Sequence, residues 1–491
     1  MLNSIKISST EQASNSLSKY SPRLYNKDLA PTREQNWSWY NIFSFWMSDV
    51  HSMGGYVVAA SLFTLGLTSW QVIICLILGI YIVQICANLI AKPSYISGVP
   101  YAVISRQAFG VFGANIPAII RGLIAFTWYG IQTYLASNAL MLVLLKFFPS
   151  FNSMTQSSWL GLSIFGWFCF GIIWFLQFIV FWHGINVIKN FIDVSGPAVY
   201  LVMLILACWI LYKTGFNRIS FFLASKNLSI YEQFWQMITA IALIVSYFSG
   251  PILNFGDFSR YGKSMREINR GNYWGLPFNF LFFSIITVII VSGTQSLFGR
   301  MITDPIETVS LIGNDLTITL ALLTIITATI GINIVANFVS SAFDFSNCFP
   351  QKISFRTGGM ISAVGSVILT PWNLFQSAEL IHYTLDILSS FIGPLFGILV
   401  ADFYFIKHGK VIIDDLFNAT PKGQYWYYEG FNLKAIATLI PSVGVCLLIN
   451  FIPLLQIVAN FSWFIGVIIS ITFYYWLATK EETNIKCSDK Y

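Results

Sequence analysis

The amino-acid sequence predicts an all-α polytopic membrane protein whose twelve transmembrane helices form a 5+5 inverted repeat plus two extra helices. Three observations predict this fold. The 491 residues are 56% hydrophobic and only 10% charged, whereas a soluble domain carries about 25% charged residues. About a dozen apolar stretches of roughly 20 residues follow one another, each long enough to cross about 30 Å of hydrocarbon. The first and the sixth of these stretches are interrupted by residues that weaken helices.

The apolar region lies between two polar ends. The first 35 residues are rich in Ser, Asn and Lys, which predicts a disordered tail, and no cleavable signal peptide is visible. A second, charged tail follows the last apolar stretch. The predicted parts are an N-terminal tail (1–35), a transmembrane domain (36–480) with repeats at about 41–212 and 233–405 and helices 11 and 12 at about 431–477, and a C-terminal tail (481–491).

The distribution of Lys and Arg predicts how the chain is oriented. If the N-terminus is cytoplasmic, the loops on that side hold most of the Lys and Arg residues, as cytoplasmic loops usually do. Both termini are therefore expected on the cytoplasmic side of a cell membrane. The same bias accounts for the formal net charge of +6 without a nucleic-acid partner. The seven cysteines are scattered and predict neither a metal site nor a disulfide framework.

The interruption of the sixth apolar stretch lies within residues 246–261, where Gly250 and Pro251 are adjacent. Pro removes a backbone donor and Gly weakens a helix. Residues 49–55, which contain Gly54 and Gly55, interrupt the first stretch in the same way. A simple proline kink is the alternative interpretation. Because an odd offset of five spans separates the interruptions, the second unit enters the membrane from the opposite face. Paired interruptions of this kind are typical of inverted-repeat transporters with a binding site between the breaks.

The third span carries Trp128 and Gln132, which lie four residues apart and therefore on one face of a helix. An indole ring can stack on a planar ligand, and an amide offers one acceptor and two donors. This pair suits a small flat heterocycle with lactam N–H and C=O groups. The alternative is that Trp128 packs in the core and Gln132 joins two helices, as polar residues in membranes often do.

Two other spans carry polar groups inside the predicted hydrocarbon region. Asn333 and Asn337 lie one turn apart in the eighth span, where they either bond another helix or contact a ligand. Asp49 and His51 lie in the first span, and ionisable groups at such positions are usually functional. Either could exchange a proton during transport, although Asp49 could instead cap or pair within the broken region. Arg121 lies near a predicted span end, where anchoring, ion pairing or gating is expected rather than substrate binding.

No sequence pattern indicates catalysis. A nucleophile–base cluster, a phosphate-binding loop and a Gly-rich dinucleotide motif are all missing from the sequence. We therefore expect neither an enzyme nor an ATP-driven pump, and we expect no cofactor.

At these residues the chain resembles nucleobase–cation symporter family 1, which includes hydantoin, allantoin, uracil, cytosine and purine permeases. The resemblance extends in order over nearly the whole chain. It implies the leucine-transporter-type fold, in agreement with the topology above. The matching segments are 36–41, 98–101, 121–122, 128–132, 254–261, 336–340, 344–347 and 370–372.

The resemblance also implies roles for individual residues. Trp128 matches the stacking Trp of the family, and Gln132 and Asn337 match its amide partners. The second stacking aromatic matches Phe248, where the hydantoin member has Trp, and the polar partner in the first span matches Ser52. Gly250 completes the implied substrate site.

The implied cation site differs from that of the sodium-coupled hydantoin member. Two adjacent hydroxyl residues of its eighth span bind Na⁺, and the matching positions here are Gly331 and Ile332, which have no side-chain oxygen. The sequence therefore favours proton coupling, with Asp49 or His51 as proton carrier.

Taken together, these patterns predict a monomeric secondary transporter that imports a small planar nucleobase or ureide by proton symport and alternating access. Uracil is favoured over allantoin, cytosine and hydantoins. The alternatives are a sodium-coupled symporter of the same substrates and a channel or transporter-like nutrient receptor.

Overall fold

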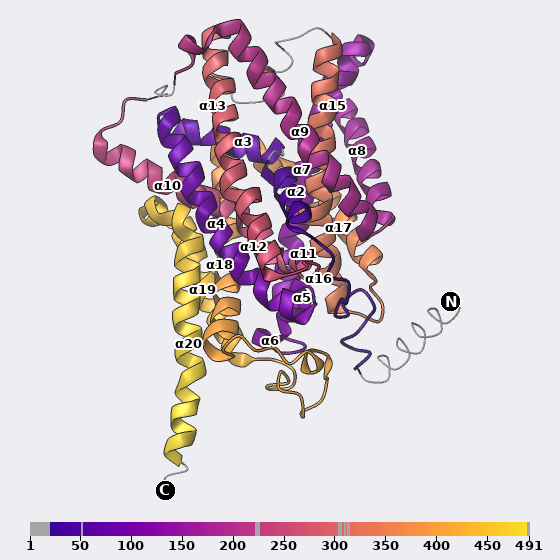
Figure 1. The fold of residues 1–491 in the computed structure, drawn as a ribbon, viewed down its shortest axis with the longest axis vertical. Helices are drawn as coiled ribbons and strands as arrows, with labels where there is room; N and C mark the ends of the chain where they lie inside the picture. Colours follow the sequence, from indigo (N-terminus) through magenta and orange to yellow (C-terminus); the bar gives the residue numbers. More distant parts are fainter. Residues whose placement is uncertain are drawn as a thin grey trace.

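The computed structural model describes residues 20–50, 53–220, 226–302, 307–308, 311 and 315–488. This part of the chain is almost entirely helical, and long helices stand side by side along the long axis of the molecule (Figure 1). Its one β-hairpin pairs β1 (Ser158–Trp159) with β2 (Leu162–Ser163) in antiparallel register. The all-α class predicted from the apolar stretches is therefore observed.

Ten helical segments in the described part are long and apolar enough to cross a membrane. They are built on α4 (Ser69–Ser97), α7 (Asn115–Phe147), α8 (Ile164–Trp182), α9 (Ile185–Thr214), α10 (Ile230–Asn254), α13 (Asn279–Phe298), α15 (Asp315–Ile332), α18 (Ala378–Val400), α19 (Leu433–Phe451) and α20 (Ser462–Ser488). The remaining helices are shorter: α2 (Trp39–Val50), α3 (Met53–Ser61), α5 (Tyr101–Ile104), α6 (Arg106–Phe109), α11 (Gly256–Ser259), α12 (Met265–Tyr273), α16 (Ser340–Cys348) and α17 (Phe355–Leu369).

The two predicted interruptions have different outcomes. In the first span α2 ends at Val50 and α3 begins at Met53, so the centre of that interruption, residues 51–52, lies outside the described residues. In the sixth span the predicted position is wrong, because α10 continues through Gly250 and Pro251 and ends at Asn254. A turn at Phe255 separates α10 from α11. Proline removes only one hydrogen bond, to the residue four before it, and the packed neighbours of α10 hold the helix together across that gap.

The eighth span contains an irregularity that the sequence analysis did not predict. Between α15 and α16 the chain forms a π-helical stretch, η5 (Asn333–Val339), that is buried along its whole length. Such stretches are rare and are frequent at functional sites. Both amides singled out in the sequence, Asn333 and Asn337, lie in η5.

The predicted tails are shorter than expected. Residues 20–36 pack against the transmembrane domain, with Leu24 and Leu29 fully or almost fully buried, because this segment carries apolar side chains among its polar ones. Its end is fixed by a parallel bridge between Trp37 and Gly262. At the other end of the chain, α20 continues to Ser488, beyond the predicted limit of helix 12 near residue 477.

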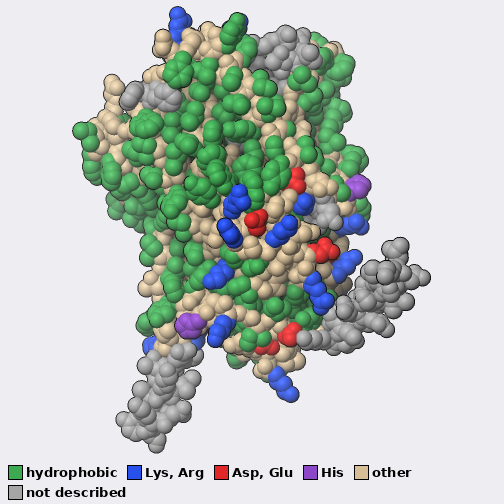
Figure 2. Space-filling model, viewed as in Figure 1, with side chains coloured by type: hydrophobic (Ala, Val, Ile, Leu, Met, Phe, Trp, Pro, Cys, Tyr) green, Lys and Arg blue, Asp and Glu red, His purple; other side chains and the backbone are tan. Residues whose placement is uncertain are grey.

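The surface divides into apolar and charged parts. Figure 2 shows hydrophobic side chains over most of the upper part of one face, whereas Lys, Arg, Asp and Glu gather toward its lower part. The described ends of the chain lie toward that same lower end in Figure 1. An apolar band beside a charged end is expected for a chain surrounded by lipid and then by water.

Arg106 joins three distant segments at this end of the molecule. Its Nη1 donates to the carbonyl of Leu416 over 2.9 Å, and its Nη2 donates to the carbonyl of Leu24 over 2.8 Å and to Asn347 Oδ1 over 2.7 Å. Burial lowers the pKa of the Arg106 guanidinium to about 9, so the group is still charged at pH 7. The N-terminal segment is thereby attached to both halves of the chain.

We expect Arg106→Lys to destabilise the protein, because a single ammonium group cannot reach all three acceptors. A hydrogen bond from a charged group contributes about 1.5–3 kcal/mol, so the loss of two should lower the free energy of unfolding by roughly 3 kcal/mol or more. Thermal unfolding of the purified protein in detergent measures this. Arg23→Lys, at an exposed arginine over the Phe112 ring, is the matched control. Equal melting temperatures for both variants would show that the three hydrogen bonds of Arg106 do not stabilise the protein.

Candidate functional site

A small cavity in the middle of the helix bundle collects most of the predicted site residues. It lies between α2, α7, α10 and the region where α15 becomes η5. The lining residues are Asp49, Arg121, Trp128, Gln132, Tyr247, Gly250, Pro251, Ile332, Ala336 and Asn337. Thus five of the predicted positions, Asp49, Trp128, Gln132, Gly250 and Asn337, come together from four separate spans.

Two aromatic side chains form one wall of the cavity. Trp128 on α7 meets Tyr247 on α10 edge to face, with ring centroids 5.4 Å apart and an interplanar angle of 85°. Phe248 does not line the cavity. Its ring instead packs edge to face against Tyr247 and against Phe280. Adjacent residues on a helix point about 100° apart, and here Tyr247 faces the cavity while Phe248 faces Phe280.

Gln132 presents an amide with an unused acceptor. Its side chain is buried, and its Oε1 has no hydrogen-bond partner among the described residues. The backbone of α3 approaches it closely, since a Cβ at Gly54 would lie 2.5 Å from Gln132 Nε2 and 2.9 Å from Tyr247 Oη. Gly54 therefore allows α3 to lie against the amide, and a ligand in the cavity can supply the hydrogen bond that Oε1 lacks.

The two asparagines of η5 have different roles. Asn333 is held by the protein: its Nδ2 donates to the carbonyl of Tyr129 over 3.0 Å, to Thr133 Oγ1 over 3.1 Å and to Gln177 Oε1 over 2.7 Å. It therefore joins η5 to α7 and α8, which is the structural alternative considered for it. Asn337 donates to Asn333 Oδ1 over 2.8 Å and lines the cavity. The first amide thus orients the second.

Arg121 lines the cavity, contrary to the expectation that it serves only at a span end. Its guanidinium is almost fully buried, and one Nη2 hydrogen bond, of 3.3 Å, reaches the carbonyl of Ala336. Its Nε and Nη1 have no partner among the described residues. The charges of Asp344 and Asp257, neither of which lines the cavity, also act on it. Arg121 precedes Trp128 by seven residues, two helical turns, and this spacing could have identified it in the sequence.

The first span contributes a buried carboxylate. Asp49 is 3% exposed, and its Oδ2 has no hydrogen-bond partner among the described residues. His51 and Ser52, the other two predicted residues of this span, lie outside the described residues.

Gly250 of α10 faces Arg121 across the cavity, where a Cβ on Gly250 would lie 3.5 Å from Arg121 Nη2.

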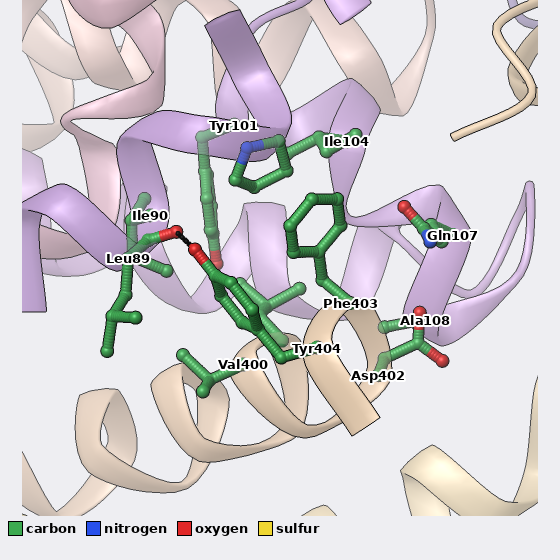
Figure 3. A pocket seen from close by; sticks show the side chains of 12 residues that line it. Leu89, Ile90, Tyr101, Ile104, Gln107, Ala108, Val400, Asp402, Phe403 and Tyr404 are labelled. Carbon is green, nitrogen blue, oxygen red and sulfur yellow. Dashed lines mark hydrogen bonds between the residues drawn. The ribbon is translucent and has the colours of Figure 1, made fainter. Parts of the chain in front are cut away.

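A second cavity lies toward the end of α18 and has a different character (Figure 3). It is lined mainly by apolar side chains of α4, α5 and α6 and of η7 (Ala401–Ile406). Tyr404 Oη donates to the carbonyl of Leu89 over 3.0 Å, and Asp402 Oδ1 accepts a bond of 2.8 Å from Tyr474. None of the predicted substrate residues lines it, so the cavity between α7 and α10 is the candidate site.

We expect Asn333→Ala to lower the stability of the protein, because it leaves Gln177 Oε1 and Asn337 Nδ2 buried without a partner. A buried unsatisfied group costs about 1–3 kcal/mol, which thermal unfolding in detergent should detect as a clear fall in melting temperature. Asn152→Ala, in the exposed segment after α7, is the control and should change little. If the two variants have the same melting temperature, Asn333 does not hold η5 against α7 and α8.

Comparisons with known proteins identify a family of permeases. The sequence profile of a family described as permeases for cytosine/purines, uracil, thiamine and allantoin matches residues 30–466. The allantoin permease of Bacillus subtilis is 32% identical over 476 residues, covering 96% of this chain and 95% of the relative. The purine-uracil permease of Arabidopsis thaliana is 33% identical over 430 residues, covering 87% of this chain and 71% of the relative.

A solved structure shares the fold. Mhp1, a nucleobase-cation-symport-1 family transporter in a closed conformation with bromovinylhydantoin bound, superposes with a TM-score of 0.78. It is 21% identical, and the match covers 93% of this chain and 95% of that one. This likeness confirms the predicted polytopic fold with an inverted repeat, while the count of twelve helices stays a prediction. The chain belongs to the permease family for cytosine/purines, uracil, thiamine and allantoin, and it is a multi-pass membrane transporter of the nucleobase type.

Proposed function

We propose that the protein imports a small planar nucleobase or ureide by proton symport and alternating access, with uracil ahead of allantoin, cytosine and hydantoins. One observation carries the proposal: Trp128 and Tyr247 stand beside the amides of Gln132 and Asn337 in one buried cavity. Aromatic walls supply contact area for a flat ring, and amides recognise its N–H and C=O edge. Relatives named as allantoin and purine-uracil permeases support this substrate class.

Arg121 favours substrates that are rich in carbonyl groups. A guanidinium offers only donors, and Nε and Nη1 of Arg121 are not used by the described residues. Uracil and allantoin present carbonyl oxygens along more than one edge, whereas cytosine replaces one of them with an amino group. An amino group facing a buried guanidinium leaves donors unpaired, which is costly. The cavity therefore favours uracil and ureides over cytosine.

The cation is proposed to be a proton carried by Asp49. Its carboxylate is buried beside the substrate residues with one oxygen unpartnered, and such groups inside membranes often mark proton relays. Gly331 and Ile332 supply no side-chain oxygen for Na⁺. One proton moving inward down a potential of about 100 mV supplies ~2.3 kcal/mol, enough for roughly fifty-fold accumulation of a neutral substrate.

Trp128→Ala should abolish uptake of labelled uracil while leaving the amount of protein in the membrane unchanged. The indole is the largest contact surface for a flat ring in the cavity, and base–aromatic stacking contributes about 1–3 kcal/mol. Trp476→Ala is a matched control, since that indole lies half exposed on α20, far from α7 in the chain. Normal uptake by the Trp128 variant would refute the site.

Asp49→Asn should uncouple transport from the proton gradient. In proteoliposomes without Na⁺, we expect the pH-driven accumulation of substrate to disappear, while exchange of internal for external substrate continues, because exchange needs no net proton transfer. Asp386→Asn, at a buried carboxylate of α18 outside the cavity, should still accumulate substrate. Uptake by the unmodified protein that requires Na⁺ and ignores a protonophore would instead establish the sodium-coupled alternative.

A further inference from the structure

Four buried charged side chains form one electrostatic group beside the candidate cavity. They are two cations and two anions: Arg121, Arg260, Asp257 and Asp344. Each is at most 3% exposed, and of the four Arg121 alone lines the cavity. A buried charge without a compensating charge is costly, and equal numbers of cations and anions leave this group balanced.

Asp257 is held in place by the backbone. Its Oδ1 accepts a hydrogen bond of 2.8 Å from the backbone N–H of Tyr101, the first residue of α5. Its Oδ2 accepts a hydrogen bond of 3.3 Å from Asn254. Both arginines act on its charge, with Arg260 the stronger of the two. Asp257 therefore joins α11 to α5, and its main counter-charge is Arg260.

Asp344 on α16 has the opposite character. Its side chain is fully buried, and neither carboxylate oxygen has a hydrogen-bond partner among the described residues. Asn254 is close to it but donates to Asp257 instead. Arg121 is the cation that acts on Asp344, and Asp344 is in turn the stronger of the two carboxylates that act on Arg121. The counter-charge of Asp344 is thus the guanidinium that lines the cavity.

The helices that carry Arg121 and Asp344 pack directly against each other. α7 and α16 are in contact, and a Cβ on Gly122 would lie 3.0 Å from Cζ of the Phe345 ring. The rings of Phe126 and Phe345 are stacked, with centroids 6.5 Å apart. Arg121 directly precedes Gly122, and Asp344 directly precedes Phe345. Since one residue advances a helix by only 1.5 Å, the two charged residues lie at the same level of this contact.

We propose that Asp344 is a positioning residue that sets how strongly Arg121 binds the carbonyl groups of the substrate. The inference rests on the substrate class proposed above. The negative charge of Asp344 opposes the field of the guanidinium in the cavity, and a carbonyl oxygen that enters must compete with it for the same cation. In a protein interior such a charge acts across the helix contact without a direct hydrogen bond.

A moderate affinity suits a transporter, because a more tightly bound ligand dissociates more slowly. Arg121 has two nitrogens without a partner among the described residues, and hydrogen bonds from a charged donor are the strong ones. Asp344 does not line the cavity, so its charge weakens this attraction without taking the space of the substrate ring. The substrate can then be held by Arg121 and still leave the cavity.

The test compares two bases that differ at one carbonyl group. Asp344→Asn removes the charge and keeps the size of the side chain. In calorimetric titrations of the purified protein we expect its Kd for uracil to fall about threefold or more, because the guanidinium is no longer opposed. Its Kd for cytosine should stay within about twofold, because an amino group replaces one of the acceptors.

Two further variants serve as controls. Asp344→Glu retains the charge and should return the Kd for uracil to that of the unmodified protein. Asp402→Asn is the matched control, at a buried carboxylate of η7 outside the cavity, and should change neither Kd. If Asp344→Asn does not fold, Asp344→Ser also removes the charge and carries the same expectation.

Damage to the fold would weaken the binding of both bases and lower the melting temperature, so tighter binding of uracil alone marks the positioning role. An unchanged or higher Kd for uracil, at an unchanged melting temperature, would show the inference to be wrong, while uracil binding by the unmodified protein would leave the proposed function standing. If both bases bind more tightly by the same factor, the charge does not act through Arg121, which also overturns the inference. If the unmodified protein binds neither uracil nor allantoin, the substrate class and the inference both fall.

Discussion

A buried amide in a membrane protein must find hydrogen-bond partners within the protein. The bonds that Asn333 makes for this reason determine the position of η5. Hydrocarbon offers no water to satisfy an amide, so the side chain is bonded to α7 and α8 instead. Those bonds fix η5 against α7, and Asn333 in turn accepts the hydrogen bond that orients Asn337. Trp128 and Gln132 stand on the same helix α7. The geometry of the cavity therefore depends on one asparagine that does not line it.

Helical periodicity was sufficient to identify part of the site. α7 is a regular helix through the region of Trp128 and Gln132. Because the two residues are four positions apart, they lie on the same face of that helix. The sequence could not distinguish Tyr247 from Phe248 in this way. Which of two adjacent aromatic residues faces a cavity depends on how the whole helix is rotated in the bundle, and that rotation is set by contacts with other helices.

The sixth span illustrates why breaks are harder to place than spans. Gly250 and Pro251 have the composition of a break, yet α10 passes through them and turns only at Phe255. One missing hydrogen bond is tolerable when neighbouring helices hold the chain in place. The local sequence shows which residues weaken a helix, whereas tertiary packing determines where the backbone actually departs from helical geometry. In the eighth span the sequence carried no proline or glycine pair at η5, and the irregularity arises where polar side chains meet their partners.

The π-helical stretch has a consequence for how this span can change. A π-turn holds more residues than an α-turn, so η5 offsets everything that follows it by part of a rotation relative to α15. If the seven residues of η5 formed a regular α-helix, each would turn the chain by about 100°, and α16 would be rotated relative to α15. Asn333 and Asp344 could then no longer both keep their present neighbours. The wider turn therefore sets the direction in which α16 presents its side chains, and the span depends on that angle although its composition is plainly hydrophobic.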